Sequence, residues 1–152
     1  MAVSMGDIEL AIAAHLRIAE LGAAAYPDEG CGVLLGRFAG SRVQIVDATS
    51  GTNLNTDRSR DRYLLDPADI VRADHEARDR QLDVVGFWHS HPDHPARPSQ
   101  FDTDHAWVDY VYVIVNTTVE GAGDLNGFTL VSEGGPFERL ALLVTSGDGT
   151  DG

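Results

Sequence analysis

The spacing of apolar and polar positions predicts helices and strands in alternation. Residues 7–24 carry apolar side chains three and four positions apart, the pattern of an amphipathic helix, and a Tyr-Pro-Asp sequence at 26–28 ends it. Residues 29–36 are apolar with interspersed glycines, and residues 42–47 alternate. These two segments are typical of strands, and the Gly-Ser pair between them predicts a turn.

The rest of the chain continues this mixture. A polar stretch at 50–61 is expected to be a surface loop. In chain order the pattern then predicts a short strand at 62–66, a helix from Asp66-Pro67 to about Gln81, a strand at 82–90, a helix at 99–108, and strands at 110–116, 127–132 and 137–144. The sequence therefore predicts one α+β domain over residues 1–144, followed by a flexible Gly/Asp-rich tail at 145–152.

Composition narrows the classes of partner. The chain has 152 residues, enough for one hydrophobic core, and a formal charge of −13, which argues against nucleic-acid binding. All eleven basic residues are Arg, and Asp outnumbers Glu 17 to 7, a bias expected either from a high-salt cytoplasm or from genome composition. The lone Cys31 excludes an internal disulfide and a Cys-based zinc cluster, and we expect it to be an inert buried thiol. With no signal-like N-terminus and no apolar stretch of roughly 18 residues, we expect a cytoplasmic protein without a membrane partner.

The main chemical signal lies between Gly86 and Trp107. An apolar strand ends at His89 and His91, and because they are two residues apart in a strand, both imidazoles point to one side. A proline-rich loop follows, and then Ser99 and Asp102 lie one turn apart at an expected helix start. Two His and one Asp leave a fourth tetrahedral position free, which is typical of a catalytic zinc site.

Simpler explanations exist for the same residues. Ser99-x-x-Asp102 is also a helix capping pattern, and histidines occur where a strand leaves the core. Of the neighbouring candidates, Asp104 points roughly 200° away from Asp102 around the helix, and His105 is either an outer partner or a surface residue. The other assignments are these: Asp93 and His94 at the rim of the site, Asn53 and Arg62 as candidates beside a substrate groove, and Trp88 and Trp107 in the core.

Hydrolysis at a metal also needs a group that takes and returns protons. A carboxylate within hydrogen-bond reach of the attacking water serves both roles. Glu29 stands at the start of an otherwise apolar strand, where a buried charge is costly without a partner. From the residues alone, a proton-transfer role and an exposed turn position are equally compatible with Glu29.

Two segments together resemble the JAB/MPN metalloenzyme (JAMM) family. They are Tyr-Pro-Asp-Glu29-Gly-Cys-Gly-Val-Leu-Leu-Gly36 and Gly-Phe-Trp-His89-Ser-His91-Pro, followed after six residues by Ser99-Gln-Phe-Asp102. The resemblance spans about residues 5–143 and is strongest to the small stand-alone bacterial members. It implies that His89, His91 and Asp102 bind Zn²⁺, that Glu29 is the general acid/base, and that Ser99 helps to hold the oxyanion. The implied fold is a curved, mostly antiparallel mixed sheet flanked by helices, similar to that of cytidine deaminases.

The resemblance also implies an activity. Family members hydrolyse peptide or isopeptide bonds at the C-terminus of ubiquitin-like proteins, and some bacterial members act on sulfur-carrier proteins that end in Gly-Gly. We therefore expect a zinc-dependent peptidase or isopeptidase with such a partner. The alternatives are a non-catalytic scaffold of the same fold and a zinc hydrolase of a small molecule; a zinc deaminase is disfavoured because its signature needs two cysteines.

Overall fold

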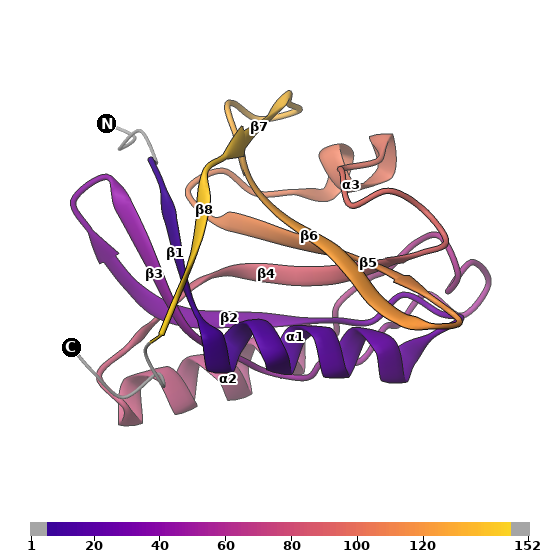
Figure 1. Cartoon of the computed structure of the whole chain (residues 1–152). Helices are drawn as coiled ribbons and strands as arrows, with labels where there is room; N and C mark the ends of the chain where they lie inside the picture. The colour runs from indigo at the N-terminus through magenta and orange to yellow at the C-terminus, as the bar shows by residue number, and fades with distance from the viewer. Residues whose placement is uncertain (1–5, 147–152) are drawn as a thin grey trace.

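The computed structural model describes residues 6–146, which form one mixed sheet with three helices (Figure 1). The elements in chain order are β1 (Ile8–Ala11), α1 (Ile12–Ala25), β2 (Cys31–Ala39), β3 (Arg42–Ala48), α2 (Pro67–Asp79), β4 (Asp83–Pro92), α3 (Gln100–His105), β5 (Val111–Thr118), β6 (Gly121–Leu130), β7 (Phe137–Leu140) and β8 (Leu142–Thr145). The prediction of a mostly antiparallel mixed sheet flanked by helices is confirmed.

The eight strands lie in the order β7-β6-β5-β4-β2-β3-β1-β8. The pairs β1–β3, β1–β8 and β4–β5 are parallel, and the remaining four pairs are antiparallel. Only Ala141 separates β7 from β8, although these strands form the two opposite edges of the sheet. The edges must therefore approach each other, so the sheet is strongly curved and nearly closes on itself (Figure 1).

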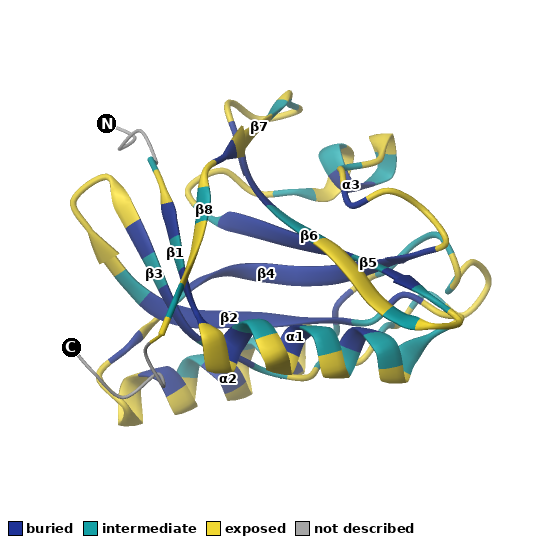
Figure 2. Cartoon of the chain, viewed as in Figure 1, coloured by how far each residue is buried: buried dark blue, intermediate teal, exposed yellow. Residues whose placement is uncertain are grey.

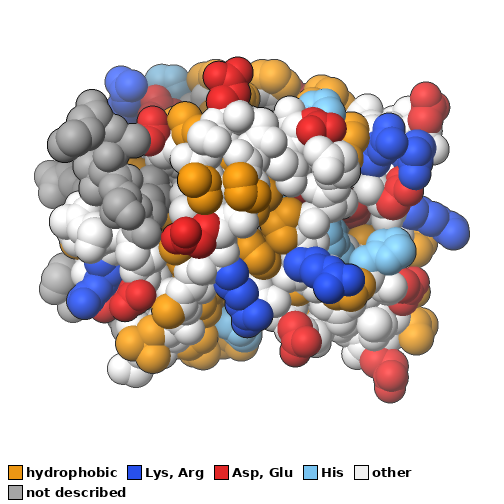
Figure 3. Space-filling view, turned by 90° about the horizontal axis from the view of Figure 1, so that it is seen from above, with side chains coloured by type: hydrophobic (Ala, Val, Ile, Leu, Met, Phe, Trp, Pro, Cys, Tyr) orange, Lys and Arg blue, Asp and Glu red, His pale blue; other side chains and the backbone are white. Residues whose placement is uncertain are grey.

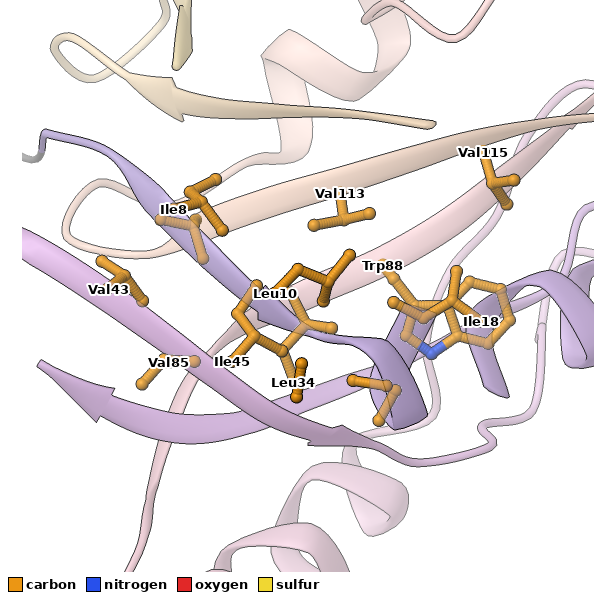
Figure 4. Packing of buried hydrophobic residues seen from close by; sticks show 14 of the residues in the cluster. Ile8, Leu10, Ile18, Leu34, Val43, Ile45, Val85, Trp88, Val113 and Val115 are labelled. Atoms are coloured by element: carbon orange, nitrogen blue, oxygen red, sulfur yellow. The ribbon is translucent and has the colours of Figure 1, made fainter. Parts of the chain in front are cut away.

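Each face of this curved sheet is covered by a different helix. On the concave side α1 contributes Ile18 to a core that also includes Leu34 and Trp88 (Figure 4). On the other side α2 packs Ala73 and Ala77 against β2 and β4. Both helices bury one stripe and expose the other, and the central strands are buried on both faces (Figure 2).

The central strand β4 runs between β2 and β5 and carries the histidines of the predicted site. A register irregularity in its pairing with β2 lies between Gly86 and Val84, so Val85 is an extra residue. Beyond this bulge the side chains alternate regularly. Trp88 enters the concave core, and the next residue, His89, points to the opposite face, where α3 lies.

The first element differs from its prediction. The expected helix at 7–24 begins with a strand, because Ile8 and Leu10 are fully buried while Glu9 between them is half-buried. This two-residue period lets β1 pair with β3 on one side and β8 on the other. The helix itself starts at Ile12, and its predicted end before Tyr26 is confirmed.

Other strands also differ from their predicted limits. The strand predicted at 137–144 is two strands, and the strand predicted at 62–66 contains only an isolated bridge between Asn53 and Leu65. The predicted tail begins at Thr145, which ends β8; residues 147–152 lie outside the described part of the chain. Over residues 6–146, no helix combines the length and apolarity needed to cross a bilayer.

Candidate metal centre

Strand β4 brings two imidazoles together below the surface. His89 and His91 lie on the same side of the strand, and His89 is only 1% exposed. Their Nε2 atoms are 3.2 Å apart. The convergence follows from the two-residue period of a strand, as the sequence predicted.

Helix α3 adds a carboxylate to this pair. One oxygen of Asp102, Oδ2, lies 3.1 Å from Nε2 of His89 and 3.0 Å from Nε2 of His91. The same oxygen accepts a hydrogen bond of 2.9 Å from the Ser99 N–H, while the Ser99 hydroxyl accepts one of 3.1 Å from the Asp102 N–H. The capping box is therefore present, and it fixes Asp102 in the orientation that faces the histidines.

The proline-rich loop sets the protonation pattern of one imidazole. Nδ1 of His91 lies 2.8 Å from the carbonyl oxygen of Pro95, so the ring proton is on Nδ1 and the Nε2 lone pair faces the cluster. His89 is positioned by stacking instead, because the Tyr63 ring lies parallel to it with centroids 4.4 Å apart. The backing residues Tyr63 and Pro95 were not predicted. Pro95 lies in a loop, and Tyr63 lies in the 62–66 segment that was predicted to be a strand but forms only an isolated bridge, so the predicted pattern did not indicate the direction of either side chain.

Glu29 completes the cluster from a distant part of the chain. It immediately precedes β2, is 4% exposed, and offers a carboxylate oxygen within 4.8 Å of the ligand atoms of His89, His91 and Asp102. Its Oε1 atom is buried without a hydrogen-bond partner among residues 6–146. Burial, with the nearby carboxylates of Asp102 and Asp61, raises the pKa of Glu29 to about 9. The alternative of an exposed turn residue is wrong.

These donors suit a divalent metal ion. Burial lowers the pKa of His89, which favours the neutral imidazole that coordinates metals. Burial alone would raise the pKa of Asp102, but His89, His91 and the Ser99 N–H together hold it well below its usual range. The three facing atoms lie 3.0–3.2 Å apart. Ligands about 2.0 Å from a tetrahedral zinc ion are separated by about 3.3 Å, so the spacing fits such an ion.

The centre opens into a cleft of about 400 Å³. Glu29, His91 and Ser99 contribute to its inner wall, and Arg58, Arg62 and Arg97 lie around it. The face viewed in Figure 3 shows basic side chains next to histidine side chains, despite the acidic composition of the chain. Asp61 also lines the cleft and pairs with Arg58, so the excess positive charge comes from Arg62 and Arg97, which favours a substrate with a carboxylate group.

The remaining candidates lie outside the cluster. Asp104 and His105 are exposed, and Nδ1 of His105 bonds to the Phe101 carbonyl, so neither adds a donor. His94 lines the cleft, and so does Arg62, whose guanidinium lies 4.8 Å from the centre of the Phe101 ring. The expectation that Trp107 is in the core is wrong, because its side chain is 54% exposed. Trp88 and Cys31 are buried as predicted, and burial raises the pKa of the Cys31 thiol to about 12.

Fold and site together define a class of protein: a curved mixed-sheet domain with a buried His-His-Asp-Glu cluster open to a cleft. A family model described as prokaryotic homologs of the JAB domain matches residues 12–130. The chain belongs to this family, and the resemblance seen in the sequence is confirmed.

Individual relatives agree with this assignment. A desampylase of Haloferax volcanii is 36% identical over 104 residues, covering 64% of this chain and 73% of the relative. A solution structure of a Salinibacter ruber protein is 35% identical with a TM-score of 0.66, covering 85% of this chain and 86% of the other. A solution structure of a Desulfitobacterium hafniense protein has a TM-score of 0.79 and 24% identity, covering 92% and 94%, and it supports the fold.

Proposed function

We propose that this protein is a zinc-dependent hydrolase of peptide or isopeptide bonds at the C-terminus of a ubiquitin-like or sulfur-carrier protein. The observation that carries the proposal is the meeting of Glu29 with His89, His91 and Asp102 in one buried cluster at the base of a cleft. Membership of the JAB family and similarity to a desampylase support a hydrolase that acts on ubiquitin-like conjugates.

The residues divide the chemistry between them. His89, His91 and Asp102 would hold the ion, which when bound polarises a carbonyl and lowers the pKa of coordinated water to about 7. The positive charge of a bound ion would favour the ionised carboxylate of Glu29, which then accepts a proton as water attacks the scissile carbonyl carbon and returns that proton to the amine as the carbon–nitrogen bond breaks. Ser99 lines the cleft, and its hydroxyl donates to the developing oxyanion.

A buried donor set also argues against a scaffold. Burying two imidazoles and two carboxylates costs stability unless they are paired, and Glu29 has an unpartnered oxygen within residues 6–146. A protein that only docks partners gains nothing from such a cluster. A bound metal ion would pair with these buried groups, and a metal-dependent reaction would account for their presence.

A direct test uses a ubiquitin-like carrier extended past its Gly-Gly end. The purified protein is incubated with this substrate, with and without a chelator, and the products are weighed by mass spectrometry. We expect loss of the extension that stops with chelator and returns with added zinc. An intact extension under every condition would favour the scaffold or the small-molecule hydrolase.

A further inference from the structure

Both the donor and the acceptor of the Asn53 side-chain amide form hydrogen bonds within the protein. Its Nδ2 donates to the carbonyl oxygens of Glu29, at 3.4 Å, and Arg62, at 3.1 Å. Its Oδ1 accepts from the backbone N–H of Asn55, at 2.9 Å, and of Leu64, at 3.0 Å. The donor half of the amide therefore joins Glu29 to the loop through Arg62, whereas the acceptor half bonds only within the loop. Asn53 does not line the cleft.

The same loop also forms a hydrogen bond with the other main-chain polar group of Glu29, its N–H. The Glu29 N–H donates to the carbonyl oxygen of Ser59 in the same loop, at 2.6 Å. The next residue, Gly30, donates to the hydroxyl of Ser90 on β4, at 2.7 Å. Both main-chain polar groups of Glu29 are thus bonded to the segment between Asn53 and Leu64.

The side chain of Glu29 has no comparable support. Its Oε1 is buried without a partner among the described residues, and no hydrogen bond between its carboxylate and another described group is formed. The range of positions that this carboxylate can reach around His89, His91 and Asp102 is therefore set by where the main chain places Cα. A displacement of about 1 Å in a reacting group is enough to cost about 100-fold in rate.

We propose that Asn53 is a positioning residue that holds Glu29 at the metal centre through the main chain. The inference rests on the function proposed above, because it assigns Asn53 to proton transfer by Glu29 rather than to substrate contact. It also explains why a polar loop far from β4 in sequence lies against the site. We call the two hydrogen bonds from this loop to the Glu29 main chain, one from Asn53 and one to Ser59, the clamp.

The test separates the two halves of the amide. Asn53→Asp keeps an acceptor for Asn55 and Leu64 but removes the donor to the carbonyl oxygens of Glu29 and Arg62, and Asn53→Ala removes both halves. Asp66→Ala is the matched control, because it deletes the cap that accepts from Ala68 at the start of α2 without touching Glu29. For each variant we would measure kcat and KM, bound zinc, thermal unfolding, and hydrogen exchange of the Glu29 amide without metal.

We expect Asn53→Asp and Asn53→Ala to lower kcat about 10- to 100-fold with KM nearly unchanged and one zinc still bound. The Glu29 amide should exchange about tenfold faster in both, reporting local opening of the clamp. Asp66→Ala should lower the unfolding temperature while kcat and Glu29 exchange keep their wild-type values.

Several results would overturn the inference. A change in KM alone would make the loop a substrate-binding element, and loss of zinc would place the effect on the metal ligands. Unchanged Glu29 exchange in both Asn53 variants would remove the clamp, whatever the activity. If the wild type shows no chelator-sensitive cleavage, the proposed function fails, and the exchange measurement still decides whether Asn53 positions Glu29.

Discussion

The two halves of the metal centre are built in different ways. The half from β4 and α3 has its side chains fixed directly: His91 by the Pro95 carbonyl, Asp102 by the Ser99 N–H, and His89 by the Tyr63 ring. The Glu29 half has a side chain with no hydrogen bond among the described residues and a main chain bonded on both sides.

This difference matches the tasks we propose for them. Metal ligands must stay within a few tenths of an ångström of a common centre, so direct support of each side chain favours binding. A group that moves a proton between water and a leaving amine must instead reach two positions. A carboxylate held only through its backbone keeps that freedom. The following predictions test whether the halves separate in this way.

The largest effect is expected from Asp102→Ala. The change removes the oxygen shared by both imidazoles and also one hydrogen bond of the capping box, so we expect loss of stoichiometric zinc and of detectable cleavage. Metal content and product mass would check this. Asp102→Asn is the control, because it keeps an oxygen for the Ser99 N–H. If Asp102→Ala still bound zinc as tightly as the wild type, the ligand assignment would be wrong.

Glu29→Gln is expected to separate binding from chemistry. The amide keeps the size of the side chain but cannot accept the proton, so kcat should fall about 10²- to 10⁴-fold while zinc stays bound. Turnover assays with parallel zinc analysis would measure both. Unaltered turnover would eliminate Glu29 as the acid/base. Loss of zinc along with activity would instead mean that Glu29 helps to bind the metal, as His89, His91 and Asp102 do.

Ser99→Ala distinguishes a helix cap from an oxyanion donor. Loss of the cap alone destabilises α3 by about 1 kcal/mol and leaves kcat nearly unchanged. Loss of an oxyanion donor lowers kcat about 10²- to 10³-fold. We expect the kinetic loss, with Ser99→Thr, which retains a hydroxyl, recovering most of it. A fall in unfolding temperature without a kinetic effect would leave Ser99 with the capping role only.

The sequence was informative where the site is local. The two-residue spacing of His89 and His91 sufficed to place both imidazoles on one face, and the Ser99–Asp102 spacing sufficed to start α3 beside them. Each inference needs only the period of one element. For Glu29 the residues alone allowed two positions, because the contact joins it to a strand about 60 residues later. The family resemblance was needed to choose.

The predictions that were wrong all concern features that depend on tertiary structure. β1 is four residues long and continues into α1 without a break, so its alternation was absorbed into the helical pattern. No Gly or Pro marks Ala141, where the chain passes from one edge of the sheet to the other. The exposure of Trp107 depends on the connection after α3 rather than on hydrophobicity. In each case tertiary arrangement decides a feature that local pattern does not encode.

The smallest effect is expected from Tyr63, which was found only in the structure. Its ring lies 4.4 Å from that of His89 at an interplanar angle of 24°, so it limits rotation of an imidazole whose Nδ1 has no partner among the described residues. An aromatic pair of this kind contributes about 0.5–1.5 kcal/mol. Tyr63→Leu should therefore weaken zinc binding by about 2- to 12-fold, as measured by competition with a chelator, with kcat of the zinc-loaded form little changed. Tyr63→Phe keeps the ring and should bind zinc like the wild type. Equal weakening in both variants would mean that the hydroxyl, rather than stacking, supports the ligand half; a loss of kcat in the loaded Leu variant would mean that the two halves are not independent.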